Sequence, residues 1–232
     1  MFRRPNPANV GDSLRDHQFE YSRAFLTRTR RMLFLHGPIY GTLSGPVVRD
    51  DSMSVDWIIN DLMALNVVSS DPIFLFVDSA GGSVVDGLIL YDTIRMSKAP
   101  VITVGRTAAS MATVVVDAGK RRLCYPHSRF MLHLPSGTIA GDSEDVKIRT
   151  KLLEELKNVL VDCLLECGAT ARFKGASPEL VRRQILKDID DAVAPKLDTK
   201  KAQDPSYLRR FHIKEREAWA KRDALALELF KA

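Results

Sequence analysis

The sequence predicts an α/β domain in which parallel strands alternate with helices. Short apolar runs of strand length, bounded by turn residues and rich in β-branched or aromatic side chains, occupy residues 31–37, 72–78, 100–105 and 128–133. Segments with helical periodicity separate them, and strands separated by helices indicate parallel pairing. The runs are almost continuously apolar, as expected of buried parallel strands.

The helices follow from the spacing of apolar residues. Residues 54–66 and 83–98 have helical patterns, and the segment SMATVVVDAG, which starts at Ser110, is interpreted as the helix after the third strand. Residues 145–167 predict one long helix of roughly 34 Å, with Gly168 as its C-cap. A helix of this length exceeds what a crossover needs, so we expect it to project and pack against another subunit. Its apolar stripe consists of Ile148, Leu152, Leu156, Val159, Leu160, Cys163 and Leu164.

The two ends of the chain differ from this pattern. Residues 1–20 are rich in Pro, Asn and Asp and predict a flexible N-terminal arm, followed by a single domain over 21–232. Residues 188–207 are polar and interrupted by prolines, which indicates a loop or insertion. Residues 214–230 are rich in Ala, Leu and Glu and predict a helix.

Composition narrows the function classes. The net charge of +5 is modest, and the basic runs TRTRR and GKRR lack interleaved aromatics, so they are interpreted as solvated surface or a polar subunit contact, not a nucleic-acid site. Cys163 and Cys167 would share a helix face, but no second pair lies at ligand spacing, so buried thiols are favoured over a metal site. With no secretory signal or membrane-length apolar window, we expect a cytoplasmic protein without metal, cofactor or membrane partner.

Three segments could carry chemistry. The turn DSAGGSV (78–84) lies between a strand and a helix, and its two glycines would let backbone amides point at an anion or oxyanion, although such turns commonly contain glycine. Ser110 would stand at a helix N-terminus, where the following amide, that of Met111, provides half of an oxyanion hole. A serine among alanines is more often a small packing residue.

His133 closes the fourth predicted strand, 23 residues after Ser110. A histidine there is usually a packed or surface residue. The carboxyl ends of neighbouring parallel strands converge on one crevice, however, so His133, Ser110 and the glycine turn belong to the same edge. A hydroxyl, an imidazole and amide donors form the serine-hydrolase arrangement.

The stretches RMLFLHGPI, FLFVDSAGGSVVDGLILYDTIR and TVGRTAASMATVVVDAGKRRLCYPHSRFMLHLPSG resemble, in order and spacing, the proteolytic subunit of the Clp protease. The resemblance covers roughly residues 20–168. It implies a ClpP/crotonase-like fold, a repeated β-β-α spiral with a protruding handle helix. It also implies that Ser110 is the nucleophile, His133 the general base, and Gly82 and Met111 the backbone oxyanion donors.

The resemblance further implies an assembly. Family members form two stacked heptameric rings with the serines facing an inner chamber, and a hexameric AAA+ ATPase threads unfolded polypeptides into it. ATP is then used by the partner and not by this chain. Cleavage after apolar residues is implied as well, and homomeric or mixed rings remain equally open.

The third member of the triad departs from the family pattern. The stretch KDIDD (187–191) resembles the start of the family's acid segment, and Asp191 occupies the acid position if one residue is missing, whereas Ala192 does without that gap. The stretch RRFHIKEREAW resembles the end of the segment and would put Arg209 there, so an insertion at about 190–208 separates the two halves. We favour Asp191, with Asp190 and Asp204 as alternatives; all three could be solvated loop acids.

Smaller departures are Ala112 and Leu134, which replace a usual glycine and glutamine, while His127 is interpreted as structural. Three functions therefore compete. The first is an active serine endopeptidase with a Ser-His-Asp triad, and the second is an inactive or weakly active scaffold subunit of a mixed ring. The third, a crotonase-type acyl-CoA enzyme, would need neither Ser110 nor His133. A membrane-anchored Ser–Lys peptidase is disfavoured, because Lys120 lies at the far end of Ser110's own helix and no anchor is present.

Overall fold

The computed structural model describes residues 22–41, 54–136, 141–167 and 176–191, without the side chains of 188–191. A helical segment over residues 22–30 precedes the first strand. The elements are, in order, β1 (Met32–His36), α2 (Val55–Val68), β2 (Ile73–Ser79), α3 (Val84–Arg95), β3 (Val101–Ala109), α4 (Met111–Asp117), β4 (Arg121–Met131), α5 (Ser143–Glu166) and α6 (Pro178–Asp191). The predicted alternation of strands and helices is confirmed. The arm at 1–20, the helix at 214–230 and Gly168 lie outside the described residues.

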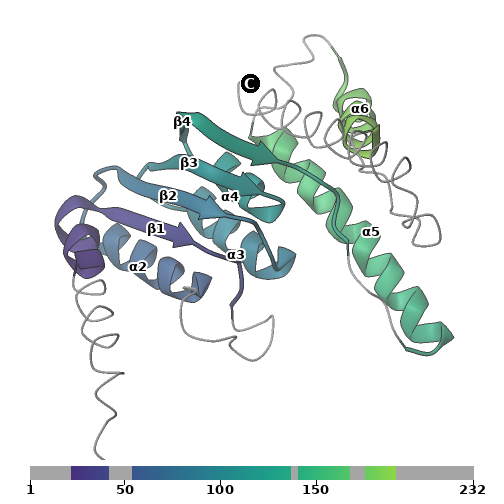
Figure 1. Cartoon of the computed structure of the whole chain (residues 1–232), viewed down its shortest axis with the longest axis horizontal. Coiled ribbons are helices and arrows are strands. Elements are labelled where there is room, and N and C mark those ends of the chain that lie inside the picture. Colours follow the sequence, from purple (N-terminus) through teal and green to yellow (C-terminus); the bar gives the residue numbers. More distant parts are fainter. Residues whose placement is uncertain (1–21, 42–53, 137–140, 168–175, 192–232) are drawn as a thin grey trace, which may run out of the picture.

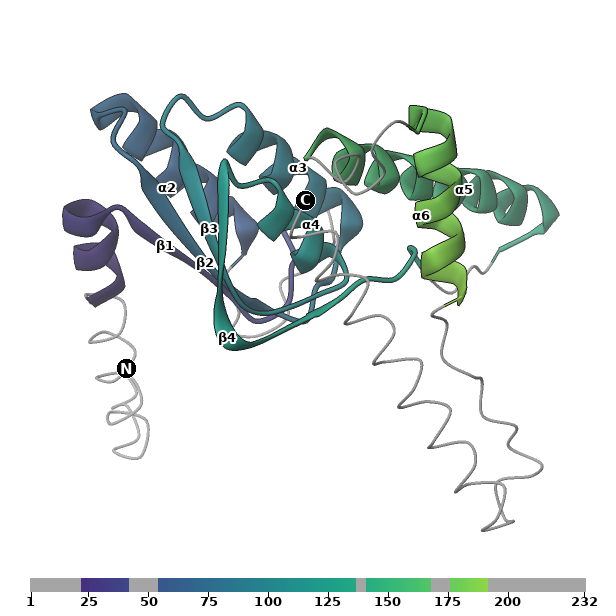
Figure 2. The same cartoon turned by 90° about the horizontal axis from the view of Figure 1, so that it is seen from above.

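The strands form one parallel sheet in the order β1-β2-β3-β4, and α2, α3 and α4 cover one of its faces (Figures 1 and 2). Burial alternates along β2: Ile73, Leu75 and Val77 are buried, whereas Phe74 and Phe76 are half-buried. The expectation that the strands are buried on both faces is therefore only partly correct for β2, because its helix-covered face is buried and its other face is half-buried. On the other face, Phe76 stacks on Phe34 with ring centroids 5.3 Å apart.

Two strands are longer than predicted and are broken by shifts in register. The pairing of β3 with β4 shifts between Gly105 and Thr107, and that of β2 with β3 shifts between Val77 and Asp78. In β2 and β3 a longer strand segment before the break and a short one after it are followed by a helix, which is consistent with the predicted β-β-α repeat, whereas the pairing of β1 with β2 has no break within the described residues of β1. Since β4 ends at Met131, His133 lies two residues beyond the strand and does not close it.

The long helix α5 begins after Asp142, whose side chain accepts hydrogen bonds from the amides of the first turn. Its C-terminal part packs into the core through buried residues such as Leu160 and Leu164, and α6 packs against it. Toward its N-terminus Ile148 and Leu152 are 61% and 52% exposed. The predicted helix is confirmed, and Figure 1 shows it extending away from the sheet.

Helix α6 was not predicted, because it offers only a short apolar pattern. Val181 and Ile185 are its buried side chains, one helical turn apart, and Pro178 occupies its first position. Among the described residues, no helix has the length and apolar character needed to cross a membrane.

A buried polar cluster ties α5 to the body of the domain. The Arg122 guanidinium donates to the Asp117 carboxylate at 2.9 Å and to the Cys167 carbonyl at 2.6 Å. The Tyr91 hydroxyl donates to the Cys163 carbonyl at 3.2 Å and lies 3.1 Å from the Cys167 sulfur. Arg122 belongs to GKRR, so this part of the run makes an internal contact, contrary to the surface interpretation. The two helix thiols are buried, and burial raises the pKa of both.

We expect Asp117 to make folding stability depend on pH. Burial raises the pKa of its carboxyl to about 7, although Arg122 opposes the rise. In the unfolded chain this pKa is about 3.9. Between these values the folded state binds the proton and the unfolded state does not, so the stability that Asp117 contributes is fully present below about pH 4 and is lost as pH rises toward 7. The two pKa values differ by about three, and each pKa step corresponds to about 1.36 kcal/mol, so the loss of folding free energy is at most about 4 kcal/mol.

Urea unfolding at constant protein concentration across pH 4–8 measures this contribution. Asp117→Asn should flatten the slope between pH 4.5 and 7, whereas Asp71→Asn, at an exposed aspartate, should leave it as in the wild type. Equal slopes for the wild type and Asp117→Asn would contradict the assignment.

Candidate active site

Ser110 occupies a strained turn between β3 and α4. Its φ and ψ are 56° and −128°, in the left-handed region that residues other than glycine rarely adopt. Such a conformation costs about 1–3 kcal/mol and persists only where neighbouring structure enforces it. Here the Ser110 amide donates to the Met131 carbonyl at 2.8 Å, and the Thr113 amide donates to the Ser110 carbonyl at 3.1 Å. A sharp strand-to-helix turn that presents a serine is the geometry of a nucleophile elbow.

The Ser110 hydroxyl does not cap the helix. A serine at this position normally accepts a hydrogen bond from the second or third helical amide, but Ser110 makes no such bond. Helix α4 spans only Met111–Asp117, shorter than predicted, so the helix dipole contributes little. The hydroxyl can therefore act as a nucleophile or bind a partner outside the described residues.

The glycine turn lies directly against Ser110. Gly81 and Gly82 have φ of 88° and 153°. A Cβ on Gly81 would lie 2.5 Å from the Ala109 carbonyl oxygen and 2.7 Å from the Ser110 Cβ, and one on Gly82 would collide with the backbone of Ile39. Ile39 holds the turn from the other side, because its amide donates to the Gly81 carbonyl and its carbonyl accepts from Ser83, both at 2.9 Å. Only glycines allow this approach.

The two predicted oxyanion donors have amides free to bind a ligand. Within the described part of the chain, the N–H groups of Gly82 and Met111 donate to no other group. The turn also approaches Met111, since a Cβ on Gly81 would lie 3.1 Å from its nitrogen. The contact of Gly81 with Ser110 was missed at the sequence level, where only the pair of glycines was visible. The oxyanion role of Gly82 and Met111 stays a prediction.

The structure brings the chain segments of Ser110 and His133 together without joining their side chains. Ala109 pairs with Met131 in the register of β3 and β4, so the residues that follow leave the same edge of the sheet. The His133 imidazole is half-buried, and its Nδ1 lies 2.6 Å from the Leu134 carbonyl oxygen. Among the described residues the Ser110 hydroxyl and His133 form no hydrogen bond. Catalytic hydrogen bonds are often long without substrate, and the roles of Ser110 and His133 stay predictions.

The predicted acid is not placed. Asp191 ends α6, and its side chain, like that of Asp190, lies outside the described residues, as do Asp204, Ala192 and Arg209 altogether. Asp78, a carboxylate at the same edge of the sheet, is directed at Arg106 and His36, at 3.5 and 3.8 Å.

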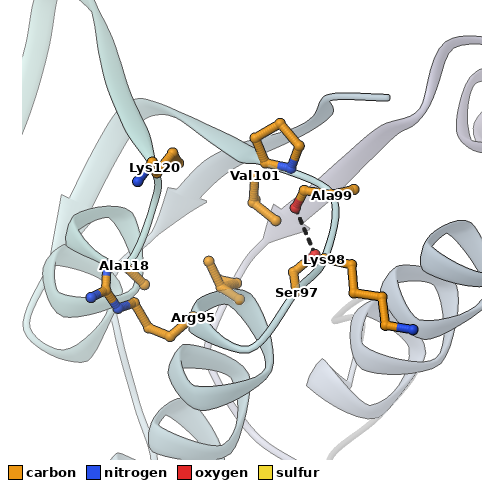
Figure 3. Close-up of a pocket in the computed structure, with 9 residues that line it drawn as sticks. Arg95, Ser97, Lys98, Ala99, Val101, Ala118 and Lys120 are labelled. Carbon is orange, nitrogen blue, oxygen red and sulfur yellow. Dashed lines mark hydrogen bonds between the residues drawn. The ribbon is translucent and has the colours of Figure 1, made fainter. Parts of the chain in front are cut away.

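A cavity of about 340 Å³ lies at the other end of β3 from Ser110, where this strand begins. Figure 3 shows Arg95, Lys98 and Lys120 around it, with the Lys98 ammonium pointing away from its centre. The cavity is separated from Ser110 by the length of β3, so it is not part of the candidate active site.

A family model described as Clp protease matches residues 29–189, more than half of the chain. The chain belongs to the Clp protease family. The match contains Ser110 and His133 and ends before Asp190 and Asp191.

Curated proteins with sequences similar to this chain are named as proteolytic subunits of ATP-dependent Clp proteases. The chain is 37% identical over 164 residues to an ATP-dependent Clp protease proteolytic subunit of Carsonella ruddii, covering 69% of this chain and 73% of that one. It is 41% identical over 101 residues to a proteolytic subunit of Nephroselmis olivacea, over 42% of this chain and 48% of the relative. A proteolytic subunit 2 of Chlamydia trachomatis is 41% identical over 110 residues, covering 44% of this chain and 54% of that one.

Proposed function

We propose that this chain is the proteolytic subunit of an ATP-dependent Clp protease and acts as a serine endopeptidase on unfolded polypeptides. The observation that carries the proposal is the backbone of Ser110. A serine held at φ 56° against a glycine turn, with no capping hydrogen bond, has a structural cost that a packing role does not require. Family membership supplies the reaction class.

In this mechanism the Ser110 hydroxyl attacks the peptide carbonyl while Nε2 of His133 accepts its proton. The amides of Gly82 and Met111 stabilise the negative charge that develops on the carbonyl oxygen. His133 then gives the proton to the leaving amine, and water hydrolyses the acyl-enzyme. The chain needs no cofactor for these steps.

Assembly is proposed to use α5. Its exposed apolar residues Ile148, Leu152 and Val159 would be buried between two stacked heptameric rings, because a projecting helix with an uncovered apolar stripe fits a second copy of itself. A hexameric AAA+ ATPase would deliver unfolded chains and use the ATP.

One observation favours a second function, a weakly active or inactive scaffold subunit of a mixed ring. Within the described residues no carboxylate pairs with His133, and Ser110 does not pair with it either. Hydrolysis of a short fluorogenic peptide with an apolar residue before the cleaved bond separates the two functions. We expect the full-length assembled chain to hydrolyse it without ATP, and to degrade an unfolded protein only with the ATPase. Assembled rings that hydrolyse neither substrate would support the scaffold.

We expect Leu152→Glu to separate the rings and to abolish peptide hydrolysis, because it places a charge in the proposed apolar contact. Sedimentation should show particles of half the wild-type mass. Thr150→Glu adds the same charge on the opposite side of α5 and should sediment as the wild type does. A Leu152→Glu particle of unchanged mass would rule out this contact.

A further inference from the structure

Thr113 carries a buried hydroxyl in an apolar stretch of α4. It is the third residue of this helix and is 2% exposed, and its neighbours Ala112 and Val114 are buried as well. Burying a hydroxyl is unfavourable unless it forms a hydrogen bond, and an alanine or valine would pack at this position without that cost. The partners of the hydroxyl therefore show what it contributes to the fold.

The Thr113 hydroxyl joins two strands at the edge of the sheet where Ser110 lies. Its Oγ1 donates to the Ala108 carbonyl of β3 and to the Met131 carbonyl of β4, both at 2.9 Å. One hydroxyl has one hydrogen, so the two carbonyls share it. A threonine in a helix usually donates to a carbonyl three or four residues earlier in the same helix. Thr113 instead reaches a second strand, so its hydroxyl ties α4 to β4.

These bonds form a closed ring around Ser110. The Met131 carbonyl accepts from the Thr113 hydroxyl and also from the Ser110 amide, at 2.8 Å, as its two lone pairs allow. The Thr113 amide in turn donates to the Ser110 carbonyl at 3.1 Å. Both backbone polar groups of Ser110 are thus held through the same two residues. The ring supplies the neighbouring structure that a serine at φ 56° needs in order to persist.

The same ring places the chain that leads to His133. Met131 is the last residue of β4 and lies two residues before His133. Phe130 and Leu132, on either side of it, are 1% and 3% exposed, so the Met131 peptide cannot shift without moving closely packed core side chains. A bond from α4 to the Met131 carbonyl therefore restrains the segment of His133 relative to the turn of Ser110.

We propose that Thr113 is a positioning residue of the peptidase site, whose hydroxyl holds the Met131 carbonyl against the Ser110 turn and so sets the spacing between Ser110 and His133. The inference rests on the proposed function. Thr113 is buried and cannot contact a substrate, so it acts only through the backbone of Ser110 and Met131. Misplacing a reacting group by about 1 Å can cost on the order of 100-fold in rate.

Thr113→Val keeps nearly the shape of the side chain and removes the hydroxyl. In the assembled full-length chain we expect it to lower kcat for a short peptide roughly 10- to 100-fold with KM nearly constant, and to slow the reaction of Ser110 with a fluorophosphonate to a similar degree. Thr113→Ser retains the hydroxyl and should restore most of the wild-type kcat. If the valine variant does not assemble, Thr113→Ala also removes the hydroxyl and should show the same loss of kcat.

Thr103 offers a matched control toward the start of β3. Its buried hydroxyl donates to the Val116 carbonyl of α4 at 2.6 Å and to the Arg121 carbonyl of β4 at 3.4 Å, so it joins the same three elements at the end away from Ser110. Thr103→Val should therefore lower the urea midpoint about as much as Thr113→Val does, but leave kcat unchanged. A wild-type kcat in Thr113→Val, or equal losses of kcat in both variants, would overturn the positioning role.

Hydrogen exchange distinguishes a failure of this inference from a failure of the proposed function. The Ser110 amide is bonded to the Met131 carbonyl, so in overlapping peptides that contain Ser110 it should exchange faster in Thr113→Val than in the wild type, and at the wild-type rate in Thr103→Val. Unchanged exchange in Thr113→Val would overturn the inference even in an active peptidase. Assembled wild type that neither hydrolyses the peptide nor reacts at Ser110 would instead remove the proposed function, while exchange would still decide whether Thr113 holds the turn.

Discussion

Ser110→Ala is expected to lower the hydrolysis rate of a short peptide by about 10⁴-fold or more, because no other group can form the acyl-enzyme. Losing a member of such a catalytic unit typically costs between about 10⁴ and 10⁶ in turnover. The rate should be measured on assembled particles whose sedimentation matches the wild type. Ser136→Ala, at an exposed serine beyond His133, should retain the wild-type rate within about twofold.

The same position offers an independent test of the strained backbone. Alanine keeps the Cβ that is disfavoured at φ 56°, so Ser110→Ala should change the free energy of unfolding by less than about 0.5 kcal/mol. Glycine tolerates this conformation, so Ser110→Gly should increase stability by up to about 1 kcal/mol while abolishing hydrolysis. A destabilised Ser110→Gly would show that the turn is not strained. A substitution that stabilises the fold and abolishes activity is typical of a functional site whose conformation lowers the stability of the protein.

Gly81→Ala is expected to lower both stability and activity strongly. The added Cβ would lie 2.5 Å from the Ala109 carbonyl oxygen and 2.7 Å from the Ser110 Cβ, at a φ of 88° that alanine rarely adopts. Overpacking typically costs about 1–3 kcal/mol, and the backbone conformation adds about 1 kcal/mol or more. We expect a loss of about 2–4 kcal/mol in the free energy of unfolding.

Activity should fall further than stability explains, because relief of the collision moves the turn away from Ser110 and displaces the Gly82 amide. Urea unfolding and peptide hydrolysis, measured on the fraction that remains folded, separate the two effects. Ala80→Ser changes an exposed neighbour in the same turn and should resemble the wild type in both measurements. Wild-type hydrolysis by Gly81→Ala would show that the turn does not form part of the site.

The local pattern of the sequence located the strands and helices but not how far each extends. The cores of β2 and β3 could be predicted, since 72–78 and 100–105 are apolar and end at turn residues. The continuation of β3 to Ala109 could not, because it depends on pairing with β4 across a break in register. Likewise, α6 has too few buried positions to give a clear helical pattern.

Part of the candidate site also follows from sequence. Parallel strands place Ser110 and the segment of His133 at one edge, and a resemblance to a known family selects these two among many serines and histidines. The contact of Gly81 with Ser110 is tertiary, and the contact of His133 with the carbonyl of the next residue depends on the conformation of the histidine side chain, so no spacing rule reveals either of them. The Asp117–Arg122 pair shows the same limit, because an aspartate after three valines gives no sign of its partner beyond the next turn.

The most direct test of the central claim, that the Ser110 hydroxyl is a nucleophile, is the site at which a fluorophosphonate reacts. The assembled full-length chain would be incubated with the reagent, digested, and analysed by mass spectrometry for the modified peptide. We expect the phosphonyl adduct on Ser110, with its formation slowed by His133→Ala. Assembled chain that acquires no adduct on Ser110, or an adduct on another serine that persists in Ser110→Ala, would contradict the account.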